Sequence, residues 1–181
     1  EKGVATDDDG PEAFLSGSIV DAQARYNLRN LMAPSGPALE KERATLARLC
    51  EAAGLPVDEA GRLANALRTA WVNDAAKGSN KPGALGGSSS LSIRRFEQLA
   101  WLDIEPTTIR ALRASTDILP SPTPINVNTA PPAVLAAVLG VDLGVAQRLV
   151  DHRQRTPFTN LDAMKPLLPQ TIALDPQRVA V

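Results

Sequence analysis

The chain has 181 residues, enough for one or two domains with a core of their own. Hydrophobic residues make up 44%, which excludes a disordered chain, and the formal net charge of −1 excludes the excess of positive charge that non-specific duplex binding needs. Aromatic residues are only 3%, so the core must be built from Leu, Ala, Val and Ile, and a stacking surface for single-stranded nucleic acid is disfavoured.

Cysteine content and apolar runs say little about the compartment. The single cysteine, Cys50, permits no disulfide within the chain and falls at an apolar position of an expected helix, where we expect it to be buried. No apolar run approaches the ~18 residues of a transmembrane helix. No signal peptide is visible and the chain does not begin with Met, so we expect a piece of a longer protein.

Residues 1–27 are expected to be an extended or β segment, with a solvated acidic end at 1–12. Leu15, Ile19 and Val20 could pack on a small sheet. The polar residues at 21, 23, 25 and 27 would share one face of a strand, where Asp21 could pair with Arg25. Because no nucleophile or second carboxylate accompanies this pair, we expect a structural role, the satisfaction of backbone groups, rather than a catalytic one.

Residues 28–118 are predicted to form a first helical domain. A helix begins at Pro37 or residue 38 and ends at Gly54, with a solvated face at 40–43. A second begins near Asp58, and its apolar face has clear helical spacing: Ala60, Leu63, Ala64, Leu67, Ala70 and Trp71. The Gly- and Ser-rich stretch 77–90 predicts a mobile loop. Two further helices follow, the third capped by Ser92 with Ile93, Phe96, Leu99, Ala100 and Leu102 inward, and the fourth starting at Pro106.

Residues 119–181 are predicted to form a second module, separated from the first by a stiff connector with prolines at 120, 122 and 124. Thr129 is expected to cap a helix that Gly140 ends in a left-handed conformation. Asp142 would cap the next helix, which ends near Arg153, and the two helices make a tight hairpin. A capping box at 159–162 predicts a short third helix ended by Pro166, and 171–181 reads as extended.

Two families share parts of this pattern. The run 126–130 followed by a glycine-bracketed hairpin resembles the helix-hairpin-helix repeat of DNA-binding proteins. The segment from Ser18 to Arg29, Ser-Ile-Val-Asp-Ala-Gln-Ala-Arg-Tyr-Asn-Leu-Arg, and the segment Ile-Asn-Val-Asn-Thr-Ala-Pro at 125–131 resemble two motifs of the K-type minor pseudopilins of type II secretion systems. The second resemblance is the more specific, since both motifs occur in the order of the family and at about its separation.

The pseudopilin resemblance implies a fold that is mainly α with minor β. It consists of two small SAM-like or helix-hairpin-helix-like modules attached to part of a pseudopilin α/β scaffold, whose last strands we expect to lie beyond this chain. It implies a non-enzymatic assembly subunit at the tip of the periplasmic pseudopilus. The partners would be I-type and J-type minor pseudopilins, with secreted proteins as a further class. The location would be the periplasm, with an inner-membrane anchor through an N-terminal helix absent from this sequence.

We expect no catalytic, cofactor-binding or metal-binding residues. The single histidine, His152, is expected to be exposed, and the chain has no Cys/His cluster for zinc, no phosphate-binding glycine loop and no nucleophile elbow. The resemblance allows calcium after the second helix, where the family is rich in carboxylates. Here one carboxylate, Asp74, remains, and with Asn73 and backbone carbonyls it could bind calcium weakly at best, so we expect no tight site.

DNA binding is the alternative function, through a hairpin whose turn would offer backbone amides to a phosphate. Asp142 lies between Gly140 and Gly144, where a carboxylate would repel phosphate. From residue 119 onward the chain has five basic and four acidic residues. This excess of positive charge is too small for binding to the phosphates of a DNA duplex. We therefore expect no nucleic-acid partner, and the amides of Asn126 and Asn128 to tie the connector to the hairpin instead.

Overall fold

The structure, a computed structural model, describes residues 16–17, 19–78 and 93–181. The described part is mainly helical with short strands, so the predicted fold class, mainly α with minor β, is confirmed. The α-helices are α1 (Pro37–Ala52), α2 (Glu59–Gly78), α3 (Pro106–Leu112), α4 (Pro132–Leu139) and α5 (Leu143–Arg155). The 3-10 helices are η1 (Ala22–Ala24), η2 (Leu28–Met32), η3 (Phe96–Leu102) and η4 (Leu161–Leu167), and the strands are β1 (Tyr26–Asn27), β2 (Thr116–Asp117), β3 (Ile125–Asn126) and β4 (Val179–Ala180).

Helices α1 and α2 form where the apolar periodicity predicts them. Pro37 occupies the first turn of α1, where a missing N–H costs nothing, and Gly54 follows the helix with φ 71°, a conformation that glycine adopts without strain. The facing apolar stripes are buried on both helices, and Cys50 is buried among them, as predicted. The acidic end 1–12 and the predicted loop from residue 79 onward lie outside the described residues, whereas residues 77–78 belong to α2.

The third predicted helix is a 3-10 helix. Arg95 is the N-cap residue of η3, and the Gln98 side chain accepts hydrogen bonds from the amides of Arg94 and Arg95. The expected cap, Ser92, lies outside the described residues. Ile93, Phe96 and Leu99 are buried as predicted, whereas Ala100 is exposed because the tighter 3-10 winding turns it away from the core. Helix α3 begins at Pro106, as predicted.

Two small parallel sheets organise the chain. Strand β1 pairs with β2, with Tyr26 opposite Thr116, and β3 pairs with β4, with Ile125 opposite Val179. Helices α1, α2, η3 and α3 lie between β1 and β2 in the sequence, and α4, α5 and η4 lie between β3 and β4. Each helical group is therefore the crossover connection that a parallel strand pair requires.

The prediction of an extended segment before β1 is wrong in two respects. Residues 22–24 form the 3-10 turn η1, because the Asp21 side chain caps it by accepting from the Gln23 amide. Ile19 and Val20 pack on no sheet, since they are 103% and 67% exposed. Leu15 lies outside the described residues.

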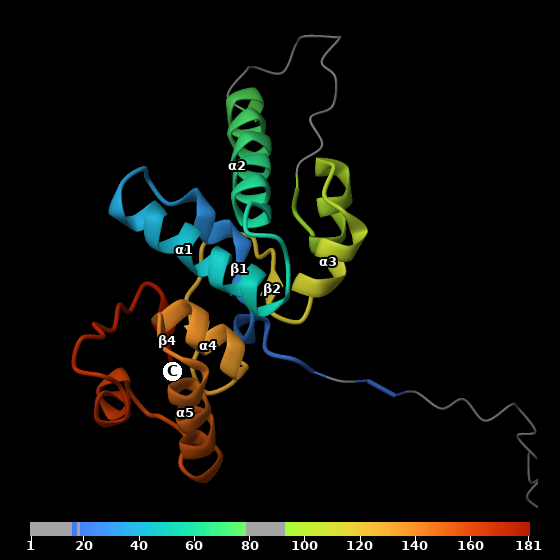
Figure 1. Cartoon of the computed structure of the whole chain (residues 1–181). Coiled ribbons are helices and arrows are strands. Elements are labelled where there is room, and N and C mark those ends of the chain that lie inside the picture. The colour runs from blue at the N-terminus through green and yellow to red at the C-terminus, as the bar shows by residue number, and fades with distance from the viewer. Residues whose placement is uncertain (1–15, 18, 79–92) are drawn as a thin grey trace, which may run out of the picture.

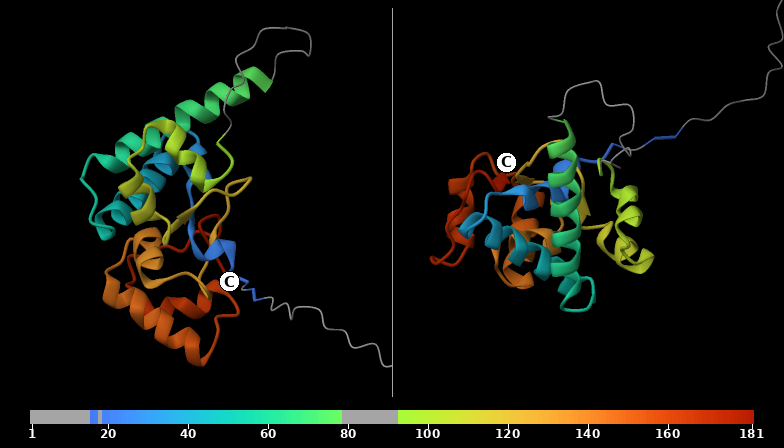
Figure 2. Two further views of the ribbon diagram at one scale, coloured as in Figure 1. Left: turned by 90° about the vertical axis from the view of Figure 1, so that its right-hand side faces the viewer. Right: turned by 90° about the horizontal axis from the view of Figure 1, so that it is seen from above.

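The two helical groups are packed against each other through α1 and α4. Figure 1 shows α1, α2 and α3 in the upper part of the molecule and the α4–α5 hairpin below them, and Figure 2 shows the same arrangement from two further sides. The buried core runs without a break from Leu46 of α1 to Leu135 of α4, and Arg48 donates to the Ala137 carbonyl across this contact (3.1 Å). Among the described helices, none combines the length and apolar character that a membrane span needs.

Candidate functional site

The Asp21 carboxylate joins the two sequence motifs. Its Oδ1 accepts from the Gln23 amide (2.9 Å), and its Oδ2 accepts from Asn126 Nδ2 (2.9 Å) and from the Thr129 hydroxyl (2.6 Å). The first motif thus holds the turn that leads into α4. The structural role predicted for Asp21 is confirmed.

The same contact corrects the expectation that Thr129 caps the hairpin. The N-cap residue of α4 is Pro131, without a side-chain bond, and the helix starts at Pro132. The Thr129 hydroxyl donates to Asp21 instead because a hydrogen bond to a carboxylate is stronger than one that satisfies a neutral amide. This partner lies more than 100 residues away in the sequence, so the local pattern gave no sign of it.

The predicted Asp21–Arg25 pair is also wrong. Arg25 instead forms an ion pair with Asp117 of β2 (2.8 Å), which ties the start of β1 to its partner strand. The prediction assumed that residues 21–25 are extended, and the turn η1 removes that geometry.

We expect Asp21 to make stability depend on pH at its acid end. Hydrogen bonds from Thr129, Gln23 and Asn126, the first of them the largest contribution, lower the pKa of Asp21 below its ordinary value of 3.8. A lowered pKa in the folded state stabilises the protein above the unfolded pKa, and this contribution is lost as the pH falls from about 4 through the folded value. Urea unfolding should show that Asp21→Asn costs about 1 kcal/mol at pH 7.

The matched measurement is the same pair of unfolding curves at pH 3. The difference between the wild type and Asp21→Asn should shrink there, because below its ordinary pKa the Asp21 carboxyl of the unfolded chain takes up a proton that the folded state resists. An equal difference at both pH values would contradict the role of the charged carboxylate.

The proline connector is fixed to the segment around η2 by two asparagines. Asn27 donates to the Ser121 carbonyl (2.7 Å) and accepts from the Leu119 amide (3.1 Å). Asn30 donates to the Thr123 carbonyl and accepts from its amide, both at 3.0 Å. The connector therefore holds one position relative to the first helical group.

A third asparagine closes the hairpin. Asn128 donates to the Phe158 carbonyl and accepts from its amide, both at 2.9 Å. The prediction that both amides tie the connector to the hairpin therefore holds for Asn128 but is wrong for Asn126, whose side chain donates to Asp21 of the first motif.

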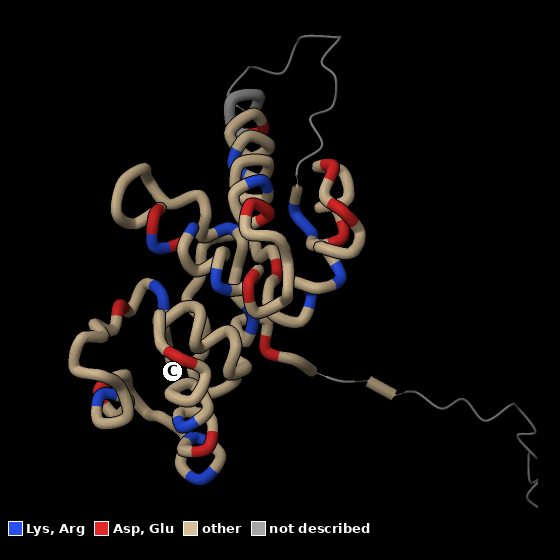
Figure 3. Tube along the Cα trace, in the orientation of Figure 1, with Lys and Arg blue, Asp and Glu red and all other residues tan. Residues whose placement is uncertain are grey.

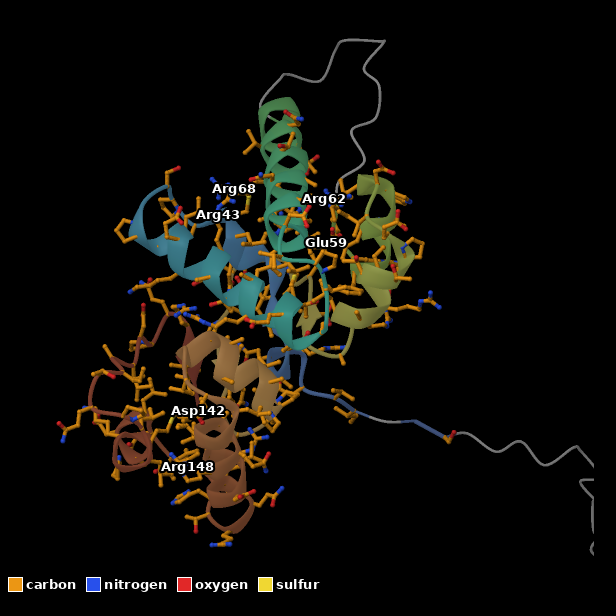
Figure 4. All side chains as sticks on the ribbon, in the orientation of Figure 1. Arg43, Glu59, Arg62, Arg68, Asp142 and Arg148 are labelled. Carbon is orange, nitrogen blue, oxygen red and sulfur yellow. The ribbon has the colours of Figure 1, made fainter. Side chains whose placement is uncertain are left out.

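The hairpin itself forms as its sequence predicts. Gly140 ends α4 at φ 69° and donates to the Ala136 carbonyl, and Asp142 caps α5 by accepting from the Val145 amide (2.8 Å). Figure 4 shows Asp142 at the turn between the two helices and Arg148 on α5. Helix α5 continues to Arg155, two residues beyond the expected end, and its last turn carries the basic residues that a helix C-terminus favours.

The third helix of this module differs from its prediction. Asn160, not Thr159, is the cap, because its side chain accepts from the Ala163 amide (3.0 Å). The helix η4 is of the 3-10 type and contains Pro166 rather than ending before it.

One residue of the expected solvated face of α1 is buried. Glu42 is 6% exposed, and its carboxylate accepts from the Tyr26 hydroxyl (2.9 Å) and from Arg178 Nε (2.8 Å). Burial and the neighbouring Glu42 charge raise the pKa of Tyr26 well above 10.0, so Tyr26 remains a hydrogen-bond donor. Local helical spacing missed this site because both donors come from outside α1.

His152 and Cys50 show no sign of chemistry. His152 is half-buried rather than exposed, since its ring stacks on Phe158 with centroids 4.9 Å apart. Burial raises the pKa of the Cys50 thiol to about 11, which keeps it protonated and unreactive near neutral pH. In the part of the chain that the structure describes, His, Cys, Asp and Glu side chains form no group of three that could hold a metal ion.

Two grooves flank the C-terminal segment 168–178. One, of about 570 Å³, lies between this segment, the start of α1 and the connector, and its ionisable residues are Lys41, Glu42, Asp175 and Arg178. Two of these, Glu42 and Arg178, are paired with each other. The other groove, of about 700 Å³, is formed by residues of η4 and the segment itself. Prolines and aliphatic side chains make up most of the wall of the second groove and half of the wall of the first.

Charges of both signs are spread over the described surface (Figure 3). Gln147 and Asp151 are bonded to each other on α5, and Arg153 of the same helix donates to the Val127 carbonyl within the module. Several large apolar side chains are also exposed to solvent, among them Val57, Trp101 and Leu143.

The segment from β3 to β4 is similar to a known family. The family described as "Type II secretion system (T2SS), protein K" matches residues 125–180, from the first residue of β3 to the last residue of β4. The matched range includes the α4–α5 hairpin, the hydrogen-bonded pair Asn128 and Phe158, and Arg178.

A protein K from Pseudomonas aeruginosa, named "Type II secretion system protein K", is 35% identical over 75 residues. The aligned region covers 41% of this chain and 22% of that protein. The region that aligns with this chain is thus less than a quarter of the length of this relative. The family resemblance drawn from the motif at 125–131 is confirmed.

Proposed function

We propose that this protein is a non-enzymatic minor pseudopilin of a type II secretion system. It assembles with the I-type and J-type minor pseudopilins at the tip of the periplasmic pseudopilus and is anchored in the inner membrane. The observation that carries the proposal is the protein K match over residues 125–180, together with the Asp21 contacts that bind this segment to the first motif. The proposal includes no catalytic residue, no cofactor and no tight metal site.

The geometry supports a role in which shape is the function. Asparagine and aspartate side chains fix the connector and the hairpin, and α1 packs on α4, so the two helical groups form one bulky head. Such a head, placed on a growing filament, would block the addition of a further subunit above it. Secreted proteins remain a further class of partner in this proposal.

The proposal is tested by mixing this protein with the soluble domains of an I-type and a J-type minor pseudopilin. We expect gel filtration with light scattering to give one species whose mass is the sum of the three chains. Each protein alone and each of the three pairs, at the same concentrations, serve as controls. Independent elution of all three proteins from the mixture would count against the proposal.

DNA binding through the hairpin is disfavoured by the turn itself. The amide of Val145, one of those at the start of α5 that would meet a phosphate, already donates to the Asp142 carboxylate. We therefore propose that nucleic acid is not a partner. A mobility shift with duplex DNA that weakens as salt increases would overturn this part of the proposal.

A further inference from the structure

The Glu42 carboxylate contacts both small sheets from the middle of α1. Its Oε2 accepts from the Tyr26 hydroxyl, and Tyr26 begins β1. Its Oε1 accepts from Arg178 Nε, and Arg178 directly precedes β4. We call Tyr26, Glu42 and Arg178 the Glu42 bridge.

The Arg178 arm is well anchored. Its Nη2 donates to the Thr45 hydroxyl (2.6 Å), and Thr45 in turn donates to the Lys41 carbonyl one turn earlier in α1. The Arg178 side chain is 19% exposed and the Glu42 side chain 8%, so water screens their attraction little. The arginine therefore has a fixed position on α1.

Apart from Val179, which is buried in the core, strand β4 and the segment before it are held mainly by backbone hydrogen bonds. The residues that precede it, from 169 to 177, are exposed or half-buried, and the turn at Asp175 is held by bonds within the segment itself. The Arg178 carbonyl accepts from the Ile125 amide (3.0 Å) and the Ala180 carbonyl from the Val127 amide (2.8 Å). The Arg178 side chain therefore holds the residue at which the pairing of β4 with β3 begins.

We infer that the Glu42 bridge couples the two sheets, so that losing the contact to β1 loosens the pairing of β3 with β4. In the described structure the Tyr26 hydroxyl donates to Glu42 and not to β3 or β4, so we expect its effect on that strand pair to pass through Glu42. With the Tyr26 bond gone, the carboxylate has one donor fewer to hold its rotamer, and the guanidinium bound to it gains freedom. The Glu42 bridge acts by positioning Arg178, and this role does not depend on which proteins bind the chain.

The test is amide hydrogen exchange of Tyr26→Phe, read residue by residue by NMR under native conditions. The amides of Ile125 and Val127 report the β3–β4 pair, and the amide of residue 26, which donates to the Ser115 carbonyl (2.8 Å), reports β1. The amide of Leu149, in the middle of α5 and buried, is the reference for global unfolding. We expect Ile125 and Val127 to exchange about fivefold faster than in the wild type, relative to Leu149, which is the change that one lost hydrogen bond of ordinary strength produces.

Two further variants separate the bridge from a general loss of stability. Arg178→Lys keeps the positive charge but loses the two guanidinium hydrogen bonds to Glu42 and Thr45. It should therefore speed exchange at the same two amides while Glu42 itself is unchanged. Arg43→Met removes the neighbouring guanidinium, whose bond is to Asn65 of α2, and should change neither amide. If Tyr26→Phe speeds exchange only at residue 26, or speeds all these amides by one factor, the coupling does not exist.

Discussion

Replacing Asn27 with alanine is expected to lower the free energy of unfolding by about 3 kcal/mol. The Asn27 side chain is 1% exposed, and its amide group bonds four partners. It donates to the Ser121 carbonyl and the Thr123 hydroxyl, and it accepts from the amides of Arg29 and Leu119. Alanine would remove all four hydrogen bonds at once, including the one that the amide of the half-buried Leu119 makes.

The matched control is Asn65→Ala. Asn65 lies on the exposed face of α2, where its side chain accepts one hydrogen bond from Arg43 (2.7 Å). Its loss should change the free energy of unfolding by less than about 0.5 kcal/mol. Urea denaturation followed by circular dichroism compares the two variants, and similar losses would contradict the role assigned to Asn27.

Leu135→Ala is expected to cost about 3 kcal/mol, with both helical groups losing stability together. Leu135 is fully buried in α4, the helix that packs on α5 and also on α1. Alanine would leave a cavity at the contact that joins the two groups. The measurement is thermal and urea unfolding with the fluorescence of Trp71 and Trp101, both in the first group.

Leu143→Ala supplies the comparison within the same hairpin. Leu143 is 60% exposed at the first position of α5, so its truncation creates no cavity. It should lower the free energy of unfolding by less than about 0.5 kcal/mol. An unchanged tryptophan signal for Leu135→Ala, with only far-UV helix signal lost, would show that the first group does not depend on the second.

The helices were predictable because their signals are local. The apolar stripe of α2, the proline at the start of α1 and the Gly140–Asp142 turn each act within a few residues, and the structure has all three. The buried apolar residues followed from the same periodicity. The similarity of residues 125–180 to the protein K family was predictable too, because the motif at 125–131 is specific in its residues and their spacing.

The polar contacts were not predictable in the same way. The local sequence suggests a nearby partner for three polar side chains. It suggests a first-turn amide for Thr129, the neighbouring Asp21 for Arg25, and solvent for Glu42. Each instead bonds a residue distant in the sequence: Asp21, Asp117 and Arg178. Spacing within one element carries no information about such partners, because the fold of the whole chain brings them together. The division of the chain at residues 27 and 118 stays a prediction.

The parallel pairing of β1 with β2 also bears on the order of folding. The pair cannot form until a crossover that contains α1, α2, η3 and α3 has brought Tyr26 and Thr116 together. A chain with this much helix would be expected to fold quickly, yet closing so long a loop is slow because its entropy must be lost before the strands gain any contact. The helices should therefore appear early, and the final, rate-limiting event should be the meeting of two strands that leave the ribosome at well-separated times.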